Sequence, residues 1–468
     1  MPPQSPPLPN DLQCSAAQSH FAWLALPVLF SLILLTIAIA YGFQYRVEDA
    51  HITRYFTVAT LIAGAFLAAF TVLAMRSAGR PALPRAQPHP QALATGLTLL
   101  SLICSVYFYS GPAALPTIVL LAGLTGVSLA LAAIRHLDWA LWFLAASGTA
   151  LFVYLGLATP INVDAANMLP VIAASCDSIA VGENPFGRIY PGISSVMMYY
   201  LPLHVLPYCP FEWSGVDLRW LNIILFVALM FVIGHRFDFR NRPEIIGLTF
   251  LPLLFSPMSF QMSYYGHVWS YWLIATLLAI ALADRRYAAA TVILGFMLLT
   301  RQTTLFVAGM VGAAFVARLG WAPTLRYAAI AGGMFVAGML LTQVYSGFPA
   351  QNFYLGIKVA SQAIQTVATT PFDQISLSGR VLELSAGTRP YMMYIQAGLA
   401  GALCLPLLRS GGLHQWQTVV LVGIGYIVTM SLSVFLHRYF YGSGLLIVAS
   451  GLAVALQGQA EVTGQKRS

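Results

Sequence analysis

The segment "DWALWFLAASGTALFVYLGLAT", residues 138–159, carries a single charged side chain, Asp138, at its first position. Every later residue is apolar, small or uncharged. At a rise of about 1.5 Å per residue, a helix of this length crosses a hydrocarbon layer of roughly 30 Å. Similar runs of about 18–22 residues recur along the chain. The pattern therefore predicts a helical protein that crosses a membrane many times.

The overall composition agrees with this prediction. Of 468 residues, 59% are hydrophobic and only 8% are charged, and the mean hydropathy is +0.76. A soluble protein of this size needs a much larger charged surface. We expect an all-α, polytopic transmembrane bundle of about fourteen helices. The expected spans are residues 20–43, 55–75, 91–110, 115–134, 138–159, 216–235, 244–260, 267–284, 287–301, 303–319, 326–345, 389–408, 415–436 and 440–457.

The long polar segments between these spans divide the chain. Two of them are expected to be extracytoplasmic loops with short helices lying at the membrane interface. The expected parts are a disordered Pro-rich tail (1–19), N-terminal transmembrane helices (20–137), a transmembrane core (138–347) that includes an outer loop (160–215), a second outer loop (348–388), and C-terminal helices with a cytoplasmic tail (389–468).

The net charge of +8 reflects the distribution of arginines and not nucleic-acid binding. Arginines gather in the short connections, where the positive-inside bias places them in the cytoplasm. This orientation is self-consistent. It places both termini in the cytoplasm and both long loops outside. We expect a multi-pass protein of the bacterial inner (plasma) membrane with its active site on the periplasmic or extracellular side.

The chain has five cysteines, and Cys176 and Cys209 share the first long loop. An extracytoplasmic loop permits a disulfide. The spacing alone leaves the pairing open, because a disulfide requires a geometry that sequence does not show.

The first long loop carries a recognisable pattern. An acid, Asp164, follows the span by a few residues, and "GENPFG" and "YP" come later. This resembles the first extracytoplasmic loop of the GT-C superfamily of membrane glycosyltransferases. The positions that match are Asp164, Gly182, Asn184, Pro185, Phe186, Tyr190 and Pro191, with Phe186 in place of the more common tyrosine.

In one respect the chain departs from the family. Five expected helices precede the loop, whereas the family's loop usually follows the first helix of the core. Either the four additional helices, within residues 20–134, are an N-terminal extension, or the matching loop lies earlier in the chain. The alternative acids are Glu48 and Asp49 in "QYRVEDAHITRY", residues 44–55. That loop is too short for the family's juxtamembrane helices, so Asp164 is the favoured acid.

The resemblance implies a reaction. A sugar would pass, with inversion, from a polyprenyl-phosphate donor to a hydroxyl of a glycolipid, polysaccharide or protein. Asp164 would be the catalytic general base, and cationic groups would stabilise the departing phosphate. No cofactor is implied, and dependence on a divalent metal stays open. No metal-site spacing, P-loop or Gly-rich nucleotide motif is present.

Candidates for the other roles come from the outer ends of the expected helices and from the two long outer loops. Those for the donor phosphate are Arg301, Arg438, His437 and Lys358. Those for the sugar or acceptor are His267, Tyr264, Tyr265, Asn184 and Tyr190. Each has a purely structural interpretation as well: snorkelling arginines, an interfacial aromatic belt or an ordinary Asn-Pro turn.

Rival functions stay open at this stage. A secondary transporter or lipid-linked saccharide flippase predicts ionisable groups at mid-membrane depth, where the chain's fifteen acids are scarce. An oligosaccharide ligase or polymerase predicts a larger outer arginine cluster. A membrane scaffold without activity predicts none of these features.

Overall fold

A computed structural model describes residues 90–107, 136–161, 168–185, 188–193, 201–264, 266–346, 391–431 and 439–465, with a few isolated positions between 123 and 131. The described residues are almost entirely helical and contain no sheet. Several expected parts lie outside these ranges: the N-terminal tail, the spans at 20–43 and 55–75, and the second long loop. Of the span expected at 115–134, only the isolated positions are described.

The long helices follow the hydropathy closely. They are α3 (Pro90–Tyr107), α5 (Leu137–Ala158), α9 (Arg219–Arg236), α13 (Trp269–Ala283), α14 (Tyr287–Leu298), α15 (Thr304–Leu319), α16 (Trp321–Ser346), α19 (Met392–Leu408), α20 (Gln415–Ser431) and α21 (Tyr439–Gln465). Four described segments are long and apolar enough to cross a membrane: Leu137–Ala158, Arg219–Arg236, Trp321–Leu341 and Tyr441–Gly458.

The segment expected as one helix at 244–260 is not one continuous helix. The chain instead forms three short helices, α10 (Pro243–Thr249), α11 (Leu251–Leu254) and α12 (Pro257–Tyr264). Pro252 lies in the first turn of α11 and Pro257 begins α12. Proline lacks the N–H that a continuous helix needs and clashes with the preceding turn. The apolar run is therefore divided although its hydropathy is uninterrupted.

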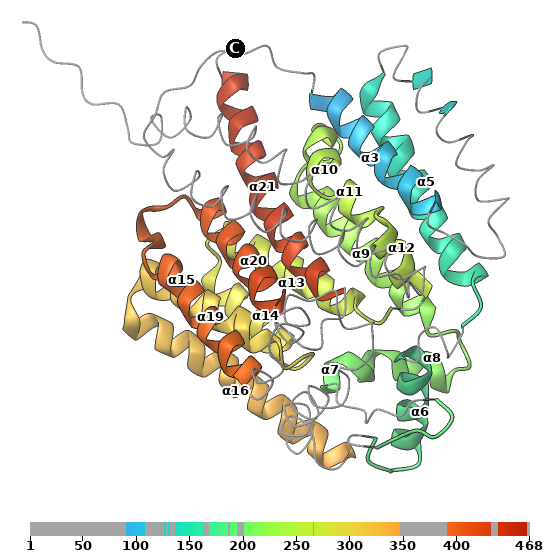
Figure 1. The fold of residues 1–468 in the computed structure, drawn as a ribbon, viewed down its shortest axis with the longest axis vertical. Coiled ribbons are helices and arrows are strands. Elements are labelled where there is room, and N and C mark those ends of the chain that lie inside the picture. Colours follow the sequence, from blue (N-terminus) through green and yellow to red (C-terminus); the bar gives the residue numbers. More distant parts are fainter. Residues whose placement is uncertain are drawn as a thin grey trace, which may run out of the picture.

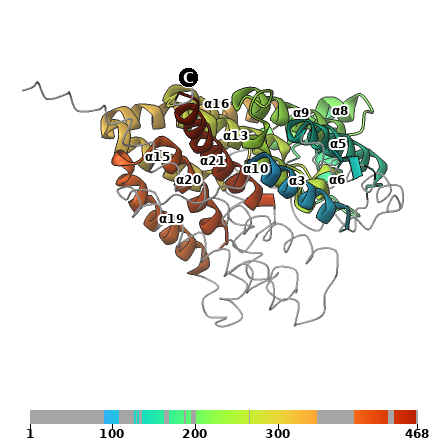
Figure 2. The same ribbon diagram turned by 90° about the horizontal axis from the view of Figure 1, so that it is seen from above.

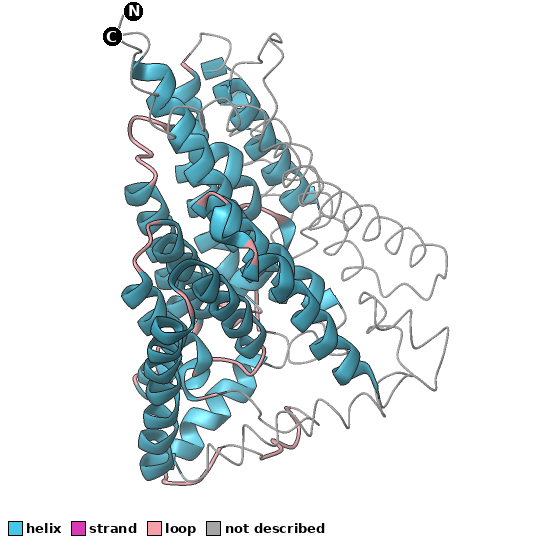
Figure 3. Cartoon of the chain, turned by 90° about the vertical axis from the view of Figure 1, so that its left-hand side faces the viewer, coloured by secondary structure: helices cyan, strands magenta, loops and turns pink. Residues whose placement is uncertain are grey.

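Helix α21 lies between two groups of helices (Figure 1). It packs against α20 and α13, and also against α10. On one side α3 and α5 lie with α10 to α12, and on the other α14, α15, α16 and α19 lie together (Figures 1 and 2). Most helices run along the length of the molecule in the side view (Figure 3). Segments from the middle and the end of the chain thus share one core.

Close packing holds these helices together. The rings of Phe152 on α5 and Phe226 on α9 stack at 3.9 Å, and Trp269 packs edge-on against both. Gly442 on α21 contacts the indole of Trp272 so closely that an added Cβ would lie 2.3 Å from the ring. Interiors packed at this density resist changes of even one methyl group.

Short helices form a separate group at one end of the bundle. They are α6 (Met168–Ala180), α7 (Pro202–Val205), η1 (Leu206–Tyr208) and α8 (Cys209–Trp213), and we call them the disulfide lobe. In Figure 1 the lobe lies at the end opposite to the C-terminal end of α21. It comes entirely from the first long loop, where short helices were expected.

Candidate functional site

Three cationic or potentially cationic side chains meet inside the protein. His204 comes from α7, His267 from the connection between α12 and α13, and Arg301 from the connection between α14 and α15. Nη2 of Arg301 lies 2.8 Å from Nε2 of His267 and 3.2 Å from Nε2 of His204. The exposed fractions are 0% for His204, 1% for His267 and 3% for Arg301. We call these three residues the Arg301 cluster.

The protonation pattern of the cluster follows from its hydrogen bonds. Arginine has only donors, so each Nε2 that faces Arg301 must accept. Both imidazoles are then neutral and carry their proton on Nδ1. In this arrangement the cluster has one positive charge, from Arg301, together with ring and guanidinium N–H groups. Such a set of donors is suited to an anion.

The imidazole of His204 lies in the first long loop and resists protonation. Its burial lowers its pKa well below the ordinary value, and the positive charge of Arg301 and the neighbouring His267 lower it further. His204 is therefore neutral at pH 7, in agreement with the hydrogen-bond pattern.

A helix break places Arg301. Helix α14 ends at Leu298 and α15 begins at Thr304, and the polar stretch "TRQTT" (300–304) lies at this break. The hydroxyls of Thr300 and Thr304 both donate to the carbonyl of Met297, at 2.6 and 3.0 Å. The backbone N–H of Thr300 donates to the same carbonyl at 3.1 Å, so backbone and side-chain donors together close the end of α14.

A second set of bonds places His267. Tyr208 on η1 donates to Oδ1 of Asn222 at 2.7 Å, and Nδ2 of Asn222 donates to the carbonyl of Gly266 at 2.7 Å. Tyr208 and Asn222 are both fully buried. This chain connects the disulfide lobe, α9 and the residue that precedes His267 in sequence, so the position of His267 depends on all three.

Aromatic hydroxyls continue from the cluster into the bundle. The guanidinium of Arg301 lies 6.0 Å from the ring centre of Tyr271 on α13. The hydroxyl of Tyr271 lies 3.2 Å from that of Tyr426 on α20. A cation over a buried aromatic ring is stabilised by the ring's electron density. The charge of Arg301 is thus held by polar and aromatic neighbours from several helices.

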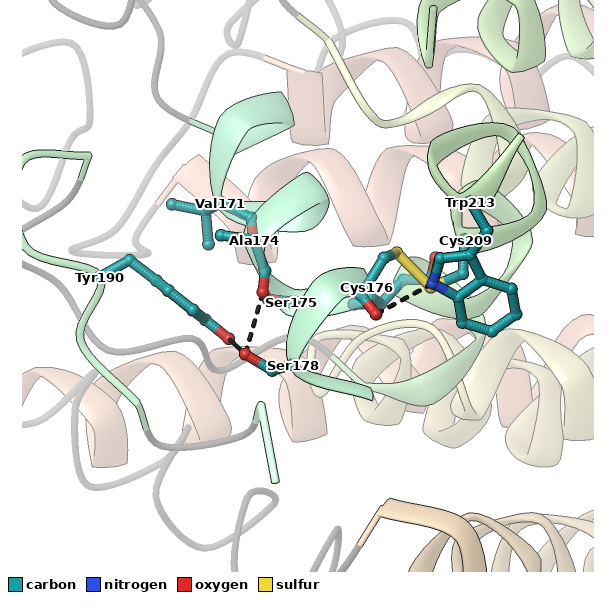
Figure 4. Close-up of a disulfide and its surroundings, with 9 residues drawn as sticks. Val171, Ala174, Ser175, Cys176, Ser178, Tyr190, Cys209 and Trp213 are labelled. Carbon is teal, nitrogen blue, oxygen red and sulfur yellow. Dashed lines mark hydrogen bonds between the residues drawn. A yellow bond between two sulfur atoms is a disulfide. The ribbon is translucent and has the colours of Figure 1, made fainter. Parts of the chain in front are cut away.

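The disulfide lobe is fastened by a bond between Cys176 on α6 and Cys209 on α8, with their Cα atoms 5.0 Å apart (Figure 4). The structure thereby decides the pairing that the sequence left open. Nε1 of Trp213 donates to the carbonyl of Cys176 at 3.1 Å. The hydroxyl of Tyr190 lies 3.3 Å from Oγ of Ser178, and Tyr190 packs in the core of the lobe.

A second buried arginine holds the C-terminal end of α5. Arg219, 7% exposed, pairs with Asp217 and donates to the carbonyl of Thr159, just beyond the end of α5. Burial alone would raise the pKa of Asp217, but the hydrogen bonds and charge of Arg219 outweigh it and hold that pKa below its ordinary value. This contact ties the residue that follows the C-terminal end of α5 to the start of α9.

The structure brings together only some of the residues that the sequence singles out. Arg301 and His267 are in contact, and Tyr264 ends α12 three residues before His267. Asn184 and Tyr190 lie in the connection between α6 and α7, and Tyr190 packs against the disulfide lobe. The remaining candidates lie outside the described residues: Asp164, Tyr265, Lys358, His437 and Arg438.

Sequence analysis missed His204. Its signal is faint, a lone histidine in the apolar stretch "LPLHVLP" (201–207), which favours an interfacial position as readily as a site. The described residues contain no group of three or more His, Cys, Asp or Glu side chains arranged to hold a metal ion.

Comparison with known proteins adds no further identification. No protein-family model matches the chain, and no match was found among curated proteins or among solved structures.

Proposed function

We propose that the chain is a multi-pass membrane glycosyltransferase that transfers a sugar from a polyprenyl-phosphate donor to an acceptor hydroxyl on the extracytoplasmic side. In this proposal the chain has about fourteen transmembrane helices, and the first and second long loops lie outside. The observation that carries it is the Arg301 cluster, a buried cation with two imidazoles at the end of the bundle where the first loop packs.

The cluster meets one requirement of the reaction. A donor of this kind holds its phosphate at the membrane surface, where the lipid chain ends. As the bond between the anomeric carbon and the phosphate oxygen breaks, the phosphate leaves with the electron pair and gains negative charge. Preorganised donors in a site without water stabilise such charge strongly. Arg301, His267 and His204 are donors of this type.

The other requirement is a base. Asp164 would accept the proton of the acceptor hydroxyl while the hydroxyl oxygen attacks the anomeric carbon from the face opposite to the phosphate. The resemblance of its loop to that of GT-C enzymes assigns this role. The contact of Arg219 with Thr159 and the helices of the disulfide lobe support the chain on the two sides of Asp164.

The test is a transfer assay with purified protein, a panel of radiolabelled polyprenyl-phosphate sugars and a crude lipid acceptor fraction. Wild-type protein should transfer label from at least one donor, and Asp164→Asn should abolish transfer. Asp177→Asn is the matched control, because Asp177 is an exposed acid on α6 of the same loop. Transfer by Asp164→Asn at the wild-type rate would exclude this base.

The alternative of a lipid-linked saccharide flippase or secondary transporter also draws support from a buried arginine, since transport sites hold such charges. It predicts that the labelled donor crosses the membrane of reconstituted vesicles without being consumed. The proposed enzyme instead yields a labelled acceptor and free polyprenyl phosphate.

A further inference from the structure

Three basic side chains from separate parts of the chain lie close together at the surface of the bundle. Arg285 lies in the connection between α13 and α14, Arg318 in the last turn of α15, and His414 in the connection before α20. Arg285 is exposed and the other two are partly exposed, so a ligand can reach the group from outside. We call these three residues the Arg318 cluster.

Hydrogen bonds hold Arg318 against the start of α20. Its Nη2 donates to the carbonyl of Leu413 and, at 3.1 Å, to Oγ1 of Thr418. Oε1 of Gln417 accepts the backbone N–H of His414 at 2.8 Å, which fixes the first turn of the same helix. The guanidinium of Arg318 therefore has a defined position, and the acceptors that hold it are neutral.

A shared acceptor brings Arg285 to the same place. The carbonyl of Leu282, near the end of α13, accepts the backbone N–H of Arg285 at 3.1 Å and Nε2 of Gln415 at 2.6 Å. Gln415 follows His414 directly in sequence. The charges of Arg285 and Arg318 are close enough to interact with each other and with the imidazole of His414.

Among the described residues, no acid balances the charge of this cluster. Asp284, which precedes Arg285, pairs with Arg236 instead. Burial lowers the pKa of His414 below its ordinary value, and the charges of Arg318 and Arg285 lower it further, so the imidazole is neutral at pH 7. The C-terminal ends of α13 and α15 carry partial negative charge, which offsets only part of the charge of two arginines.

The backbone at Arg285 adds a second observation. Its φ of 57° lies in the left-handed region, where a Cβ is unfavourable. The N–H groups of Arg285 and Arg286 donate to the carbonyls of Leu282 and Ala281, an arrangement in which glycine usually follows the end of a helix. The local backbone therefore favours glycine at this position, and the guanidinium is what the arginine supplies in its place.

The position of the cluster along the bundle indicates the source of an anion. Helices α13 and α15 end beside it and α20 begins there. Arg236 joins Asp284, just after α13, to Gln457 on α21, so this is the end of the bundle opposite to the disulfide lobe. The ends of helices that cross a membrane lie at the depth of the lipid phosphates. Basic groups between helices at this depth are suited to anionic headgroups.

We propose that Arg285, Arg318 and His414 bind the phosphate group of an anionic phospholipid. The two arginines supply the balancing charge, and the imidazole supplies a hydrogen bond. This site is separate from the Arg301 cluster. It requires that these helices cross a membrane, but it does not require that the chain transfers sugar.

The experiment is native mass spectrometry of the full-length protein in a neutral detergent that contains equal amounts of phosphatidylglycerol and phosphatidylcholine. The measured quantity is the ratio of the two lipids in the protein with one lipid bound. Phosphatidylglycerol has a net negative charge, whereas the choline cation cancels that of phosphatidylcholine. Wild-type protein should prefer phosphatidylglycerol by about tenfold, as expected for hydrogen bonds between charged groups. Equal retention of the two lipids would overturn the proposal.

Glycerol 3-phosphate distinguishes a lipid from a free phosphate. If it displaces phosphatidylglycerol from wild-type protein, the cluster recognises the phosphate group alone. If it does not, the lipid chains contribute to binding and the ligand is a membrane lipid. Both results support a phosphate site, and they differ in its source.

Arg285→Gly is the decisive variant, because glycine suits the left-handed backbone and the fold keeps its stability. Arg318→Gln removes the other charge. Each variant should reduce the preference to within about twofold of equal retention. The matched control is Arg240→Gln, at an exposed arginine in the connection between α9 and α10, and it should keep the wild-type preference.

Two results with the variants would contradict the proposal. An equal loss in Arg240→Gln and Arg285→Gly would show that the lipid is attracted by the positive field of this whole end of the bundle. A wild-type preference in both Arg285→Gly and Arg318→Gln would exclude the cluster directly. Circular dichroism checks that each variant is folded, and Arg285→Gly decides the matter even when Arg318→Gln does not fold.

This inference and the proposed function fail separately. Protein that transfers sugar but shows no preference for phosphatidylglycerol contradicts the inference alone. Protein that retains phosphatidylglycerol through the Arg318 cluster yet transfers sugar from no donor contradicts the proposed function alone.

Discussion

Replacing Tyr208 with phenylalanine tests whether the bonds from Tyr208 through Asn222 to Gly266 hold the site together. The change removes one hydroxyl and leaves the ring, so packing is preserved. The lost bond is 2.7 Å long and lies between two fully buried side chains. Oδ1 of Asn222 would then lose this donor where water has no access.

The expected loss is worked from that burial. A typical exposed bond contributes about 0.5–1.5 kcal/mol, but a buried acceptor left without its donor costs about 1–3 kcal/mol. We expect Tyr208→Phe to lower the free energy of unfolding by about 2 kcal/mol. The expected displacement of Gly266 also moves His267, so affinity for a phosphate ligand should fall as well.

Tyr190→Phe is the matched control. It removes a hydroxyl from the same lobe, but its contact with Ser178 is longer, at 3.3 Å, and Ser178 also donates to the carbonyl of Ala174. The expected loss is about 0.5 kcal/mol. The measurement is equilibrium unfolding in mixed detergent micelles, followed by tryptophan fluorescence. Losses for the two variants that agree within about 0.5 kcal/mol would refute the reasoning.

Three further changes test other parts of the structure. Because Arg219 lowers the pKa of Asp217, their pairing stabilises the fold above the ordinary carboxyl pKa of 3.8, and this stabilisation disappears as the pH falls through the lowered pKa. Arg219→Gln should remove this pH-dependent part of the free energy of unfolding, measured between pH 6 and 2. A pH dependence equal to that of wild type would contradict the pairing. Gly442→Ala should destabilise the protein by about 1–3 kcal/mol through overpacking, whereas Gly398→Ala, where a Cβ meets nothing within 4 Å, should be neutral or stabilising in the same unfolding assay. Reduction of the disulfide, which closes a separation of 33 residues, should lower stability by about 2–4 kcal/mol and make the lobe sensitive to limited proteolysis; equal cleavage with and without reductant would show that the bond does not support it.

Local features of the fold were predictable because they depend on neighbouring residues. Lengths of apolar runs locate most of the described helices within a few residues. Hydropathy separates the spans at 287–301 and 303–319 but leaves open a single kinked helix. The structure decides for two helices, α14 and α15. Pro252 and Pro257 carried the information needed to divide the span expected at 244–260, but hydropathy averages over such positions.

The composition of the site was only partly predictable. Arg301 and His267 stood out, because a charge or a histidine is conspicuous at the end of an apolar run. His204 did not, since nothing near it in sequence distinguishes it from an interfacial histidine. The disulfide likewise needed the geometry, because two cysteines in one loop allow a bond without requiring it.

The sequence by itself determined that this chain is helical, where most helices begin and end, and which few polar side chains enter apolar segments. Those properties follow from the desolvation of side chains and backbone groups over short distances along the chain. Tertiary structure alone decided which of those side chains meet. Arg301 contacts a histidine 97 residues away in sequence. That contact depends on how α7, the connection before α13 and the break before α15 pack together, and no local pattern encodes this packing.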